Sequence, residues 1–219
     1  PRGLATGRPF FLKPQGPFGK NGGFGYFAGF SVLPDWLAWD SFKLANGVAS
    51  LEELRSRLER IQIGARIEAD PGGRIGCCLI AGAVFFPEHD WVAAPEDWSL
   101  RTQSGARIDL SHGDGARLWR ECRERVASAA AVVREQAERY GEPVLGRPLL
   151  GQAIFRVRVL DSYGRACAVT TEHSLPVLDA AHIKPFAEGG AHDVTNGLSL
   201  RTDRSEEHTS ELQSLAYLV

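Results

Sequence analysis

His182 is the residue of this chain whose type and surroundings best suit catalysis. It lies in the segment VLDAAHIKPFAEGGAHDVTNGLSLRTD, residues 177–203, ahead of a glycine-rich turn and of the pair Asn196 and Gly197. A neutral imidazole can accept a proton from water, and an amide side chain can tie a loop together or orient the imidazole. Taken alone, a single His is more often a structural residue, and Asn before Gly is also typical of a plain turn. The residues around His182 must therefore decide whether it is a general base.

The string of residues around His182 is more specific than any one of its members. It contains a Gly-Gln and a Phe-Arg pair, then a Tyr and a Cys, then Ala-Ala-His-Ile-x-Pro and last Asn-Gly-Leu, which here are Gly151, Gln152, Phe155, Arg156, Tyr163, Cys167, 180–185 and 196–198. These parts occur together in the HNH endonucleases of the restriction type, which residues 146–203 resemble. The resemblance implies DNA as the substrate. It also implies a ββα-metal finger, in which a hairpin is followed by a helix and one divalent ion lies between them.

The resemblance further implies roles for two residues. His182 matches the general base of the family and Asn196 matches its Asn, so both are candidate catalytic residues. Hydrolysis of a phosphodiester needs a deprotonated water beside the phosphorus and positive charge on the oxygens; an imidazole meets the first need and a metal ion the second. The ion is expected to be Mg²⁺, Mn²⁺ or Zn²⁺ in the intact parent, and Asp179, three residues before His182, is a candidate carboxylate ligand. His173 and His192 lie in expected loops and are interpreted as solvated residues.

The residues after Asp203 depart from the family pattern. Family members carry a His on the next helix and a carboxylate or second His one turn later, whereas this chain has Ser205 and Thr209 at those places. The segment RSEEHTSELQS, from Arg204, reads as the translation of a sequencing-library adapter in the frame AGA TCG GAA GAG CAC ACG TCT GAA CTC CAG. We therefore expect residues 204–219 to be a non-native tail, the HNH motif to be truncated, and this fragment to hold no metal and to be inactive.

Other side chains are candidates for contact with DNA. Lys184 and Arg201 could bind phosphates, although a plain surface role fits them equally well. Trp36, Trp39 and Trp91 belong to an aromatic-rich region that is similar to PUA-like barrels, in which stacked aromatic rings could hold a flipped base. Packing into a core explains the same aromatic residues without any ligand.

Hydrophobic periodicity predicts two helices. A capping box of Ser50 and Glu53 precedes apolar residues at helical spacing, which predicts a helix over residues 51–62. A second apolar series predicts a helix over residues 116–140 that stops at Gly141. The charged outer face of the second helix indicates a solvated connecting helix, with contact to the DNA backbone as the alternative.

The remaining patterns indicate strands. After a turn at residues 70–73, the apolar run over residues 75–86 predicts a buried strand. Alternation over Phe155–Leu160 predicts another strand, and a further strand is expected to start at residues 166–170. The fold class that follows is α+β.

Four consecutive regions are expected along the chain. An N-terminal mixed-sheet domain over residues 1–112 would sense or bind DNA, and a linking helix would follow over residues 113–143. The incomplete HNH nuclease domain would occupy residues 144–203, and the tail would complete the chain at residues 204–219. Restriction-type enzymes often act as dimers, so a homodimer fits the resemblance, although no partner face is marked in the sequence.

Composition sets broad limits. The formal net charge is −2, which gives no whole-chain argument for nucleic acid, and 43% apolar residues with 9% aromatic residues favour a packed core. No apolar stretch reaches the roughly 20 residues that span a bilayer, and no signal peptide is evident. The four Cys form no C-x-x-C pair, which favours a reducing, cytoplasmic setting over disulfides or a zinc ribbon. Since the chain has no Met, Pro1 is not expected to be the natural start.

Two other functions remain open at this point. A non-catalytic reader of modified DNA would use the N-terminal domain and keep the finger only as a platform, and a plain structural protein would make the string around His182 a coincidence. The codons that follow Asp203 in an intact copy of the gene test the first alternative. We expect them to encode Leu-His and, one turn later, a carboxylate or His; a continuation without metal-ligating residues would favour the reader.

Overall fold

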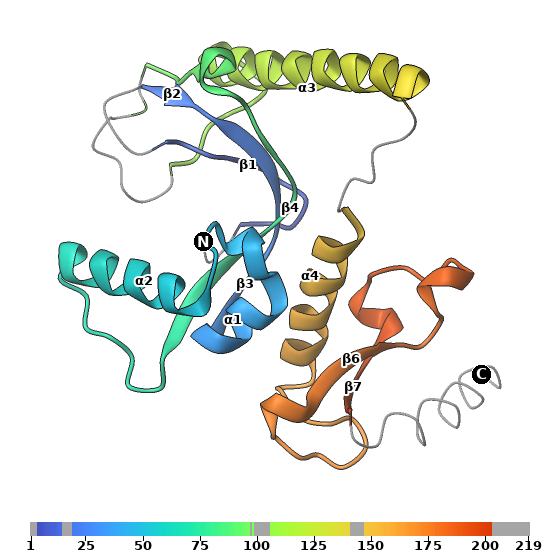
Figure 1. Ribbon diagram of the computed structural model, residues 1–219. Helices are drawn as coiled ribbons and strands as arrows, with labels where there is room; N and C mark the ends of the chain where they lie inside the picture. The colour runs from blue at the N-terminus through green and yellow to red at the C-terminus, as the bar shows by residue number, and fades with distance from the viewer. Residues whose placement is uncertain (1–3, 15–18, 97, 99–105, 141–146, 203–219) are drawn as a thin grey trace. The chain divides into compact units, whose positions relative to one another are not determined.

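The chain folds as a mixed α+β protein with small sheets (Figure 1). The computed structural model describes residues 4–14, 19–96, 98, 106–140 and 147–202, and these residues form four α-helices and seven strands. Within this described part, no helix is both long enough and apolar enough to cross a membrane. This mixture of helices and small sheets confirms the α+β fold class expected from the sequence.

Two compact units divide the chain, and each combines two separate segments. The first is Pro1–Ala28 with Ile80–Leu145, and the second is Gly29–Leu79 with Gly146–Val219. This division is interleaved, whereas the sequence suggested consecutive domains. The functional roles assigned to those domains stay predictions.

The strands within residues 9–93 form two small sheets. Strand β1 (Pro9–Phe11) pairs with the first part of β3 (Gly23–Pro34), which in turn neighbours β4 (Arg74–Phe85). A separate pair joins β2 (Lys20–Asn21) to β5 (Val92–Ala93). Both β3 and β4 extend across the division between the two units, at residues 28–29 and 79–80. The expected N-terminal domain and its likeness to PUA-like barrels stay predictions.

The core of the first unit explains its aromatic residues. Phe24 is buried and lies edge-on to Trp119 at 5.1 Å between ring centroids. Phe86 and Val92 complete the cluster from the strand side, and Leu118 from the helix side. The rings of Phe24, Phe86 and Trp119 therefore pack in this core.

Helix α3 (Gly113–Tyr140) confirms the helix expected over residues 116–140. Its buried positions Leu118 and Cys122 lie four apart and face the core, as the periodicity indicated. On the outer side, Arg117 pairs with Asp114 and Glu121 of the same helix. These partly buried pairs account for the charges of Arg117, Asp114 and Glu121 without a ligand.

The first segment of the second unit contains two helices. After β3 come α1 (Asp35–Phe42) and α2 (Leu51–Ala65), and the second confirms the helix expected over residues 51–62. The side chain of Ser50 accepts a hydrogen bond from the backbone N–H of Glu53 at 3.1 Å, and the Glu53 carboxylate accepts from the N–H of Ala49 at 2.8 Å. The capping box is therefore formed, with Ala49 in place of Ser50 as the second donor.

The C-terminal segment packs a helix against a hairpin (Figure 1). Helix α4 (Arg147–Ser162) lies beside β6 (Leu178–His182) and β7 (Gly197–Arg201), which pair antiparallel. A cluster of buried apolar side chains holds this segment together, and it consists of Leu160, Cys167, Leu178 and Leu200. This hairpin is the element that carries His182.

The strand expected over Phe155–Leu160 is wrong, because these residues belong to α4. Ala153, Val157 and Leu160 are buried at helical spacing, and Phe155 and Val159 are buried as well. A helix buried on more than one side shows apolar residues at alternate positions over a short window, so alternation did not distinguish it from a strand.

Two further expectations about strands need correction. Residues 166–170 form turns, in which the N–H of Thr171 donates to the carbonyl oxygen of Cys167 at 2.9 Å. The strand expected over residues 75–86 forms as β4, and the turn at residues 70–73 precedes it, yet Leu79 is the one fully buried residue within β4. An apolar run therefore marked the strand correctly but overstated its burial.

Candidate active site

The hairpin places His182 opposite Gly197. His182 is the last residue of β6 and Gly197 the first of β7, and their Cα atoms are partners in the ladder. The sequence suggested that Gly197 permits a tight turn, but its backbone is extended, with φ −130° and ψ 142°. Glycine is needed for space instead, because a Cβ here would lie 2.3 Å from Cγ2 of Val159 and 2.9 Å from Cζ of Phe155. The hairpin can approach α4 closely only without that side chain.

The imidazole of His182 is held between two rings. It stacks on Phe155 of α4 with 4.0 Å between ring centroids and 11° between ring planes. Its Nε2 lies 3.0 Å from Nδ1 of His192. The side chain is partly buried and also lines an open cleft, so it is fixed in orientation yet remains accessible.

His192 was not identified from the sequence, which suggested a solvated loop residue. It is partly buried, and its ring stacks on Phe186 with 4.4 Å between centroids and 10° between planes. The spacing of ten residues between the two His matches neither a helix nor a strand period, so pattern analysis had no basis for pairing them. The adjacent Gly189 and Gly190 were the only sign in the sequence that the loop between the two His residues is tightly folded.

Asn196 ties together the loop that joins the two strands. Its Oδ1 accepts a hydrogen bond from the N–H of Lys184 at 2.8 Å, and its Nδ2 donates to the carbonyl oxygens of Lys184 at 3.0 Å and Ala191 at 2.9 Å. Gly190 lies inside this clamp, where a Cβ would come within 1.9 Å of the carbonyl oxygen of Lys184. In this geometry Asn196 shapes the loop, and its catalytic role stays a prediction.

The electrostatics of the site favour a neutral His182. Burial lowers the pKa of His182 below its ordinary value of 6.5, and the neighbouring His192 lowers that pKa further. An imidazole that is neutral at pH 7 has a lone pair with which to accept a proton. This is the protonation state that a general base requires.

A cleft of about 830 Å³ opens beside His182, between α1 with its following turn and α4 with β6. Arg156 lies in its wall between two carboxylates: its Nη1 donates to Oδ2 of Asp40 at 2.7 Å, and its Nε lies 3.0 Å from Oδ1 of Asp179. The second contact has the distance of an ion pair but not the direction of a hydrogen bond. Lys43 and Arg156 both lower the pKa of Asp40, Lys43 the more strongly. Of these charged residues, sequence reasoning assigned a binding role to Asp179 alone.

The candidate metal ligand Asp179 is thus an ion-pair partner of Arg156. Residues 4–14, 19–96, 98, 106–140 and 147–202 contain no cluster of three or more His, Cys, Asp or Glu that could hold a metal ion. The donors among these described residues therefore do not fit a bound divalent ion. The positions expected to carry the family's ligands, Ser205 and Thr209, lie outside the described residues.

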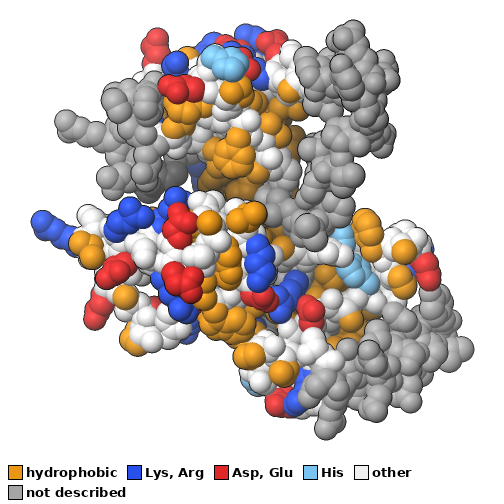
Figure 2. Space-filling view, in the orientation of Figure 1, with side chains coloured by type: hydrophobic (Ala, Val, Ile, Leu, Met, Phe, Trp, Pro, Cys, Tyr) orange, Lys and Arg blue, Asp and Glu red, His pale blue; other side chains and the backbone are white. Residues whose placement is uncertain are grey.

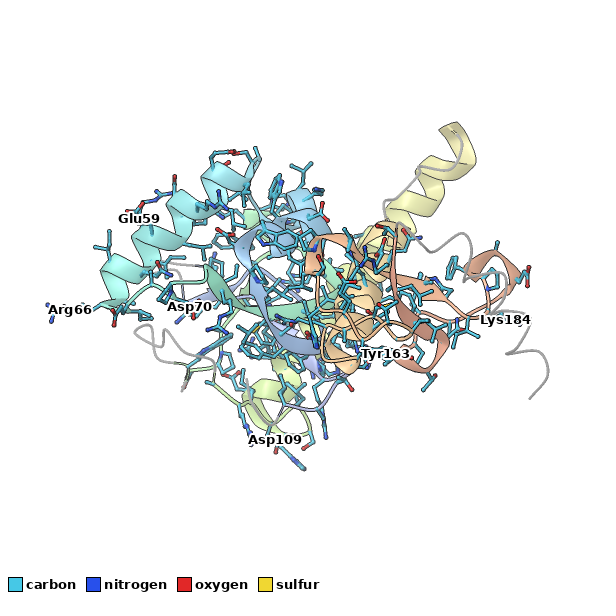
Figure 3. The ribbon with its side chains drawn as sticks, turned by 90° about the horizontal axis from the view of Figure 1, so that it is seen from below. Glu59, Arg66, Asp70, Asp109, Tyr163 and Lys184 are labelled. Carbon is cyan, nitrogen blue, oxygen red and sulfur yellow. The ribbon has the colours of Figure 1, made fainter. Side chains whose placement is uncertain are left out.

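The two cations expected to bind DNA differ in their surroundings. Lys184 is exposed and lies at the outer edge of the segment after β6 (Figure 3). Arg201, on β7, forms an ion pair with Glu172. On the face drawn in Figure 2, positive and negative side chains are interspersed and do not form a single basic patch.

The tryptophans expected to stack on a base belong to different units. Trp36 and Trp39 lie on α1 and are partly buried. Trp91 packs against the core of the other unit, where its Nε1 donates to the carbonyl oxygen of Phe86 at 3.0 Å. An aromatic cage built from all three stays a prediction.

Comparison with known proteins supports the resemblance at this site. Residues 167–208 match the family model described as HNH endonuclease, and the match includes His182, His192 and Asn196. It supports an HNH endonuclease domain at the C-terminal end, and hence nuclease activity, a hydrolase activity, with DNA as the substrate. The match continues to His208, so the origin of the tail stays a prediction. Neither the curated proteins nor the solved structures include a match to the chain.

Asn196→Ala tests the clamp. The change removes the acceptor of the Lys184 N–H and the donor to two carbonyl oxygens, so we expect faster hydrogen exchange at Lys184 and a loss of about 1–3 kcal/mol in the free energy of unfolding. Hydrogen exchange and urea unfolding measure the two effects. Thr195→Ala is the matched control, because it removes only the neighbouring bond to Asp193. Unchanged exchange at Lys184 in Asn196→Ala would contradict the clamp.

The lowered pKa of His182 predicts how stability depends on pH. Because the folded pKa lies below the unfolded value of 6.5, the unfolded chain binds the proton more readily, and stability falls as the pH drops below about 6.5. Titration of the His182 ring by NMR should give a midpoint below 6.5. A midpoint at or above 6.5 would contradict the burial argument.

Proposed function

We propose that this chain comes from a DNA endonuclease of the restriction type, in which His182 is the general base of phosphodiester hydrolysis. One observation supports this most strongly: a partly buried imidazole with a lowered pKa is fixed between Phe155 and His192 and faces a cleft. The same residue lies within the segment that matches the HNH endonuclease model. Geometry, protonation state and resemblance thus point to one residue.

The proposed reaction begins with a proton transfer to His182. A water molecule beside the phosphorus gives its proton to the imidazole, and its oxygen forms a bond to phosphorus while one ester bond breaks. The leaving oxygen takes up a proton, so the products are a phosphate monoester and an alcohol. A well-placed general base contributes a factor of about 10² to 10⁴ to the rate.

Three other side chains complete the proposal. Asn196 acts by holding the loop between the strands, so its effect on catalysis is indirect. Lys184 is exposed and suits contact with a DNA phosphate, while Arg201 must exchange its partner Glu172 for one. These contacts would place the backbone of the substrate along the hairpin.

A divalent ion belongs to the proposal for the intact parent only. Mg²⁺, Mn²⁺ or Zn²⁺ would supply positive charge to the phosphate oxygens. The donors among the described residues do not fit such an ion, so the proton transfer at His182 is the one step that this chain supports. We infer that the adapter-like sequence after Asp203 replaces the family's ligand helix, and that this fragment is inactive for that reason.

A reader of modified DNA is the second candidate. Trp36 and Trp39 lie three apart on α1 and are only partly buried, which would suit stacking on an extruded base. In that case the finger would be a platform without chemistry. Binding to methylated but not to unmethylated duplex, with no cleavage by the intact protein, would favour this candidate.

A plasmid-nicking assay tests the nuclease. With Mg²⁺ or Mn²⁺, the product of an intact gene copy should cut DNA, and His182→Ala should lower the rate by a factor of about 10² to 10⁴, the contribution of a general base. The rate should rise with pH through a midpoint below 6.5, because only neutral His182 accepts the proton.

His173→Ala is the matched control, since His173 is exposed and lies outside the site. Cleavage that survives His182→Ala would rule out His182 as the general base. Robust cleavage by the present chain that is lost in His182→Ala would instead show that its own tail replaces the family helix.

A further inference from the structure

We propose that His192 is a positioning residue for His182: it fixes the tautomer in which Nε2 of His182 carries the hydrogen and Nδ1 is the basic nitrogen. The inference deepens the proposed function and rests on the general-base role of His182. Its starting observation is the 3.0 Å distance between Nε2 of His182 and Nδ1 of His192.

A neutral imidazole pair can share its hydrogen in two ways. If Nε2 of His182 donates, the lone pair of His182 is at Nδ1 and can accept a proton from water. If Nδ1 of His192 donates instead, Nε2 of His182 uses its lone pair in the hydrogen bond, and its Nδ1 already carries a hydrogen. Only the first arrangement leaves a general base, so a nuclease needs His192 as the acceptor.

The ring of His192 is well held for this task. It stacks on Phe186, and Phe155 lies against it at 5.7 Å between centroids, so the two aromatic rings fix its plane. Asn196 donates to the carbonyl oxygen of Ala191, the residue just before His192, at 2.9 Å. Gly151 of α4 leaves the room needed, since a Cβ there would lie 3.2 Å from Cδ2 of His192. The loop clamp and the ring stack thus serve the same imidazole.

The arrangement also suits the charged form of His182. Once Nδ1 has taken a proton, Nε2–H becomes a cationic donor to His192, and hydrogen bonds from cations are stronger than those between neutral groups. The bond forms without movement of either ring. The charged groups that line the cleft, Asp40, Arg156, Asp179 and Lys43, form ion pairs with one another.

Nitrogen NMR of the ring atoms tests the proposal on the 219-residue chain at neutral pH. We expect His182 to carry its hydrogen on Nε2, with scalar coupling across the bond to Nδ1 of His192. His192→Phe keeps an aromatic ring on Phe186 but has no acceptor, so His182 should shift toward a mixture of tautomers. His192→Asp has acceptors only, at the same number of bonds from the backbone as Nδ1, and should restore the Nε2–H form.

His173→Phe is the matched control and should leave His182 unchanged. The amide spectrum of β6 and β7 reports whether each variant folds, and if His192→Phe does not, the wild-type chain and His192→Asp decide the matter. A wild-type His182 with its hydrogen on Nδ1, or an unchanged tautomer ratio in a folded His192→Phe, would overturn the proposal.

Cleavage by the intact gene product separates this inference from the proposed function. His192→Phe should slow cleavage at least about tenfold, within the factor that a general base contributes, and His192→Asp should recover part of it. If His182→Ala abolishes cleavage but His192→Phe leaves it unchanged, the positioning role fails and the nuclease stands. If no form of the protein cuts DNA, the nuclease fails, while the ring nitrogens still show whether His192 sets the tautomer.

Discussion

The close packing of α4 on the hairpin is the constraint on which the site depends. Phe155 contacts the imidazole of His182 face to face, and Gly197 on the partner strand allows this approach because it has no Cβ. A larger residue at position 197 would push the hairpin off the helix and take the imidazole away from its stacking ring. This packing contributes to the burial that lowers the pKa of His182, and His192 adds to the same shift. The helix that precedes the hairpin is therefore as much a part of the site as the strands are.

Much of the fold could be predicted from local signals. The capping box at Ser50 marked the start of α2, and apolar residues four apart marked α3. His182 and Asn196 could be found because the string around them resembles a known family, and the family match supports that resemblance. The hairpin formed by β6 and β7 was also expected from this resemblance.

What could not be predicted depends on contacts between distant residues. The alternation over Phe155–Leu160 suggested a strand, although burial on more than one side of a helix produces the same pattern. His192 looked like a solvated loop residue because its partners, Phe186 and His182, are set by the course of the loop and not by a period. The pairing of Arg156 with Asp40 joins residues 116 apart in the sequence, which no local pattern indicates.

The most direct test of the central claim is a crystal structure of the intact gene product bound to duplex DNA that carries an uncleavable linkage. Our account predicts that the scissile phosphate lies in the cleft beside His182, with one water molecule between the phosphorus and Nδ1 of the imidazole. It also predicts that Phe155 and His192 keep the contacts they make without DNA. A complex in which the duplex crosses another face, and in which protein side chains separate His182 from every phosphate, would contradict the account.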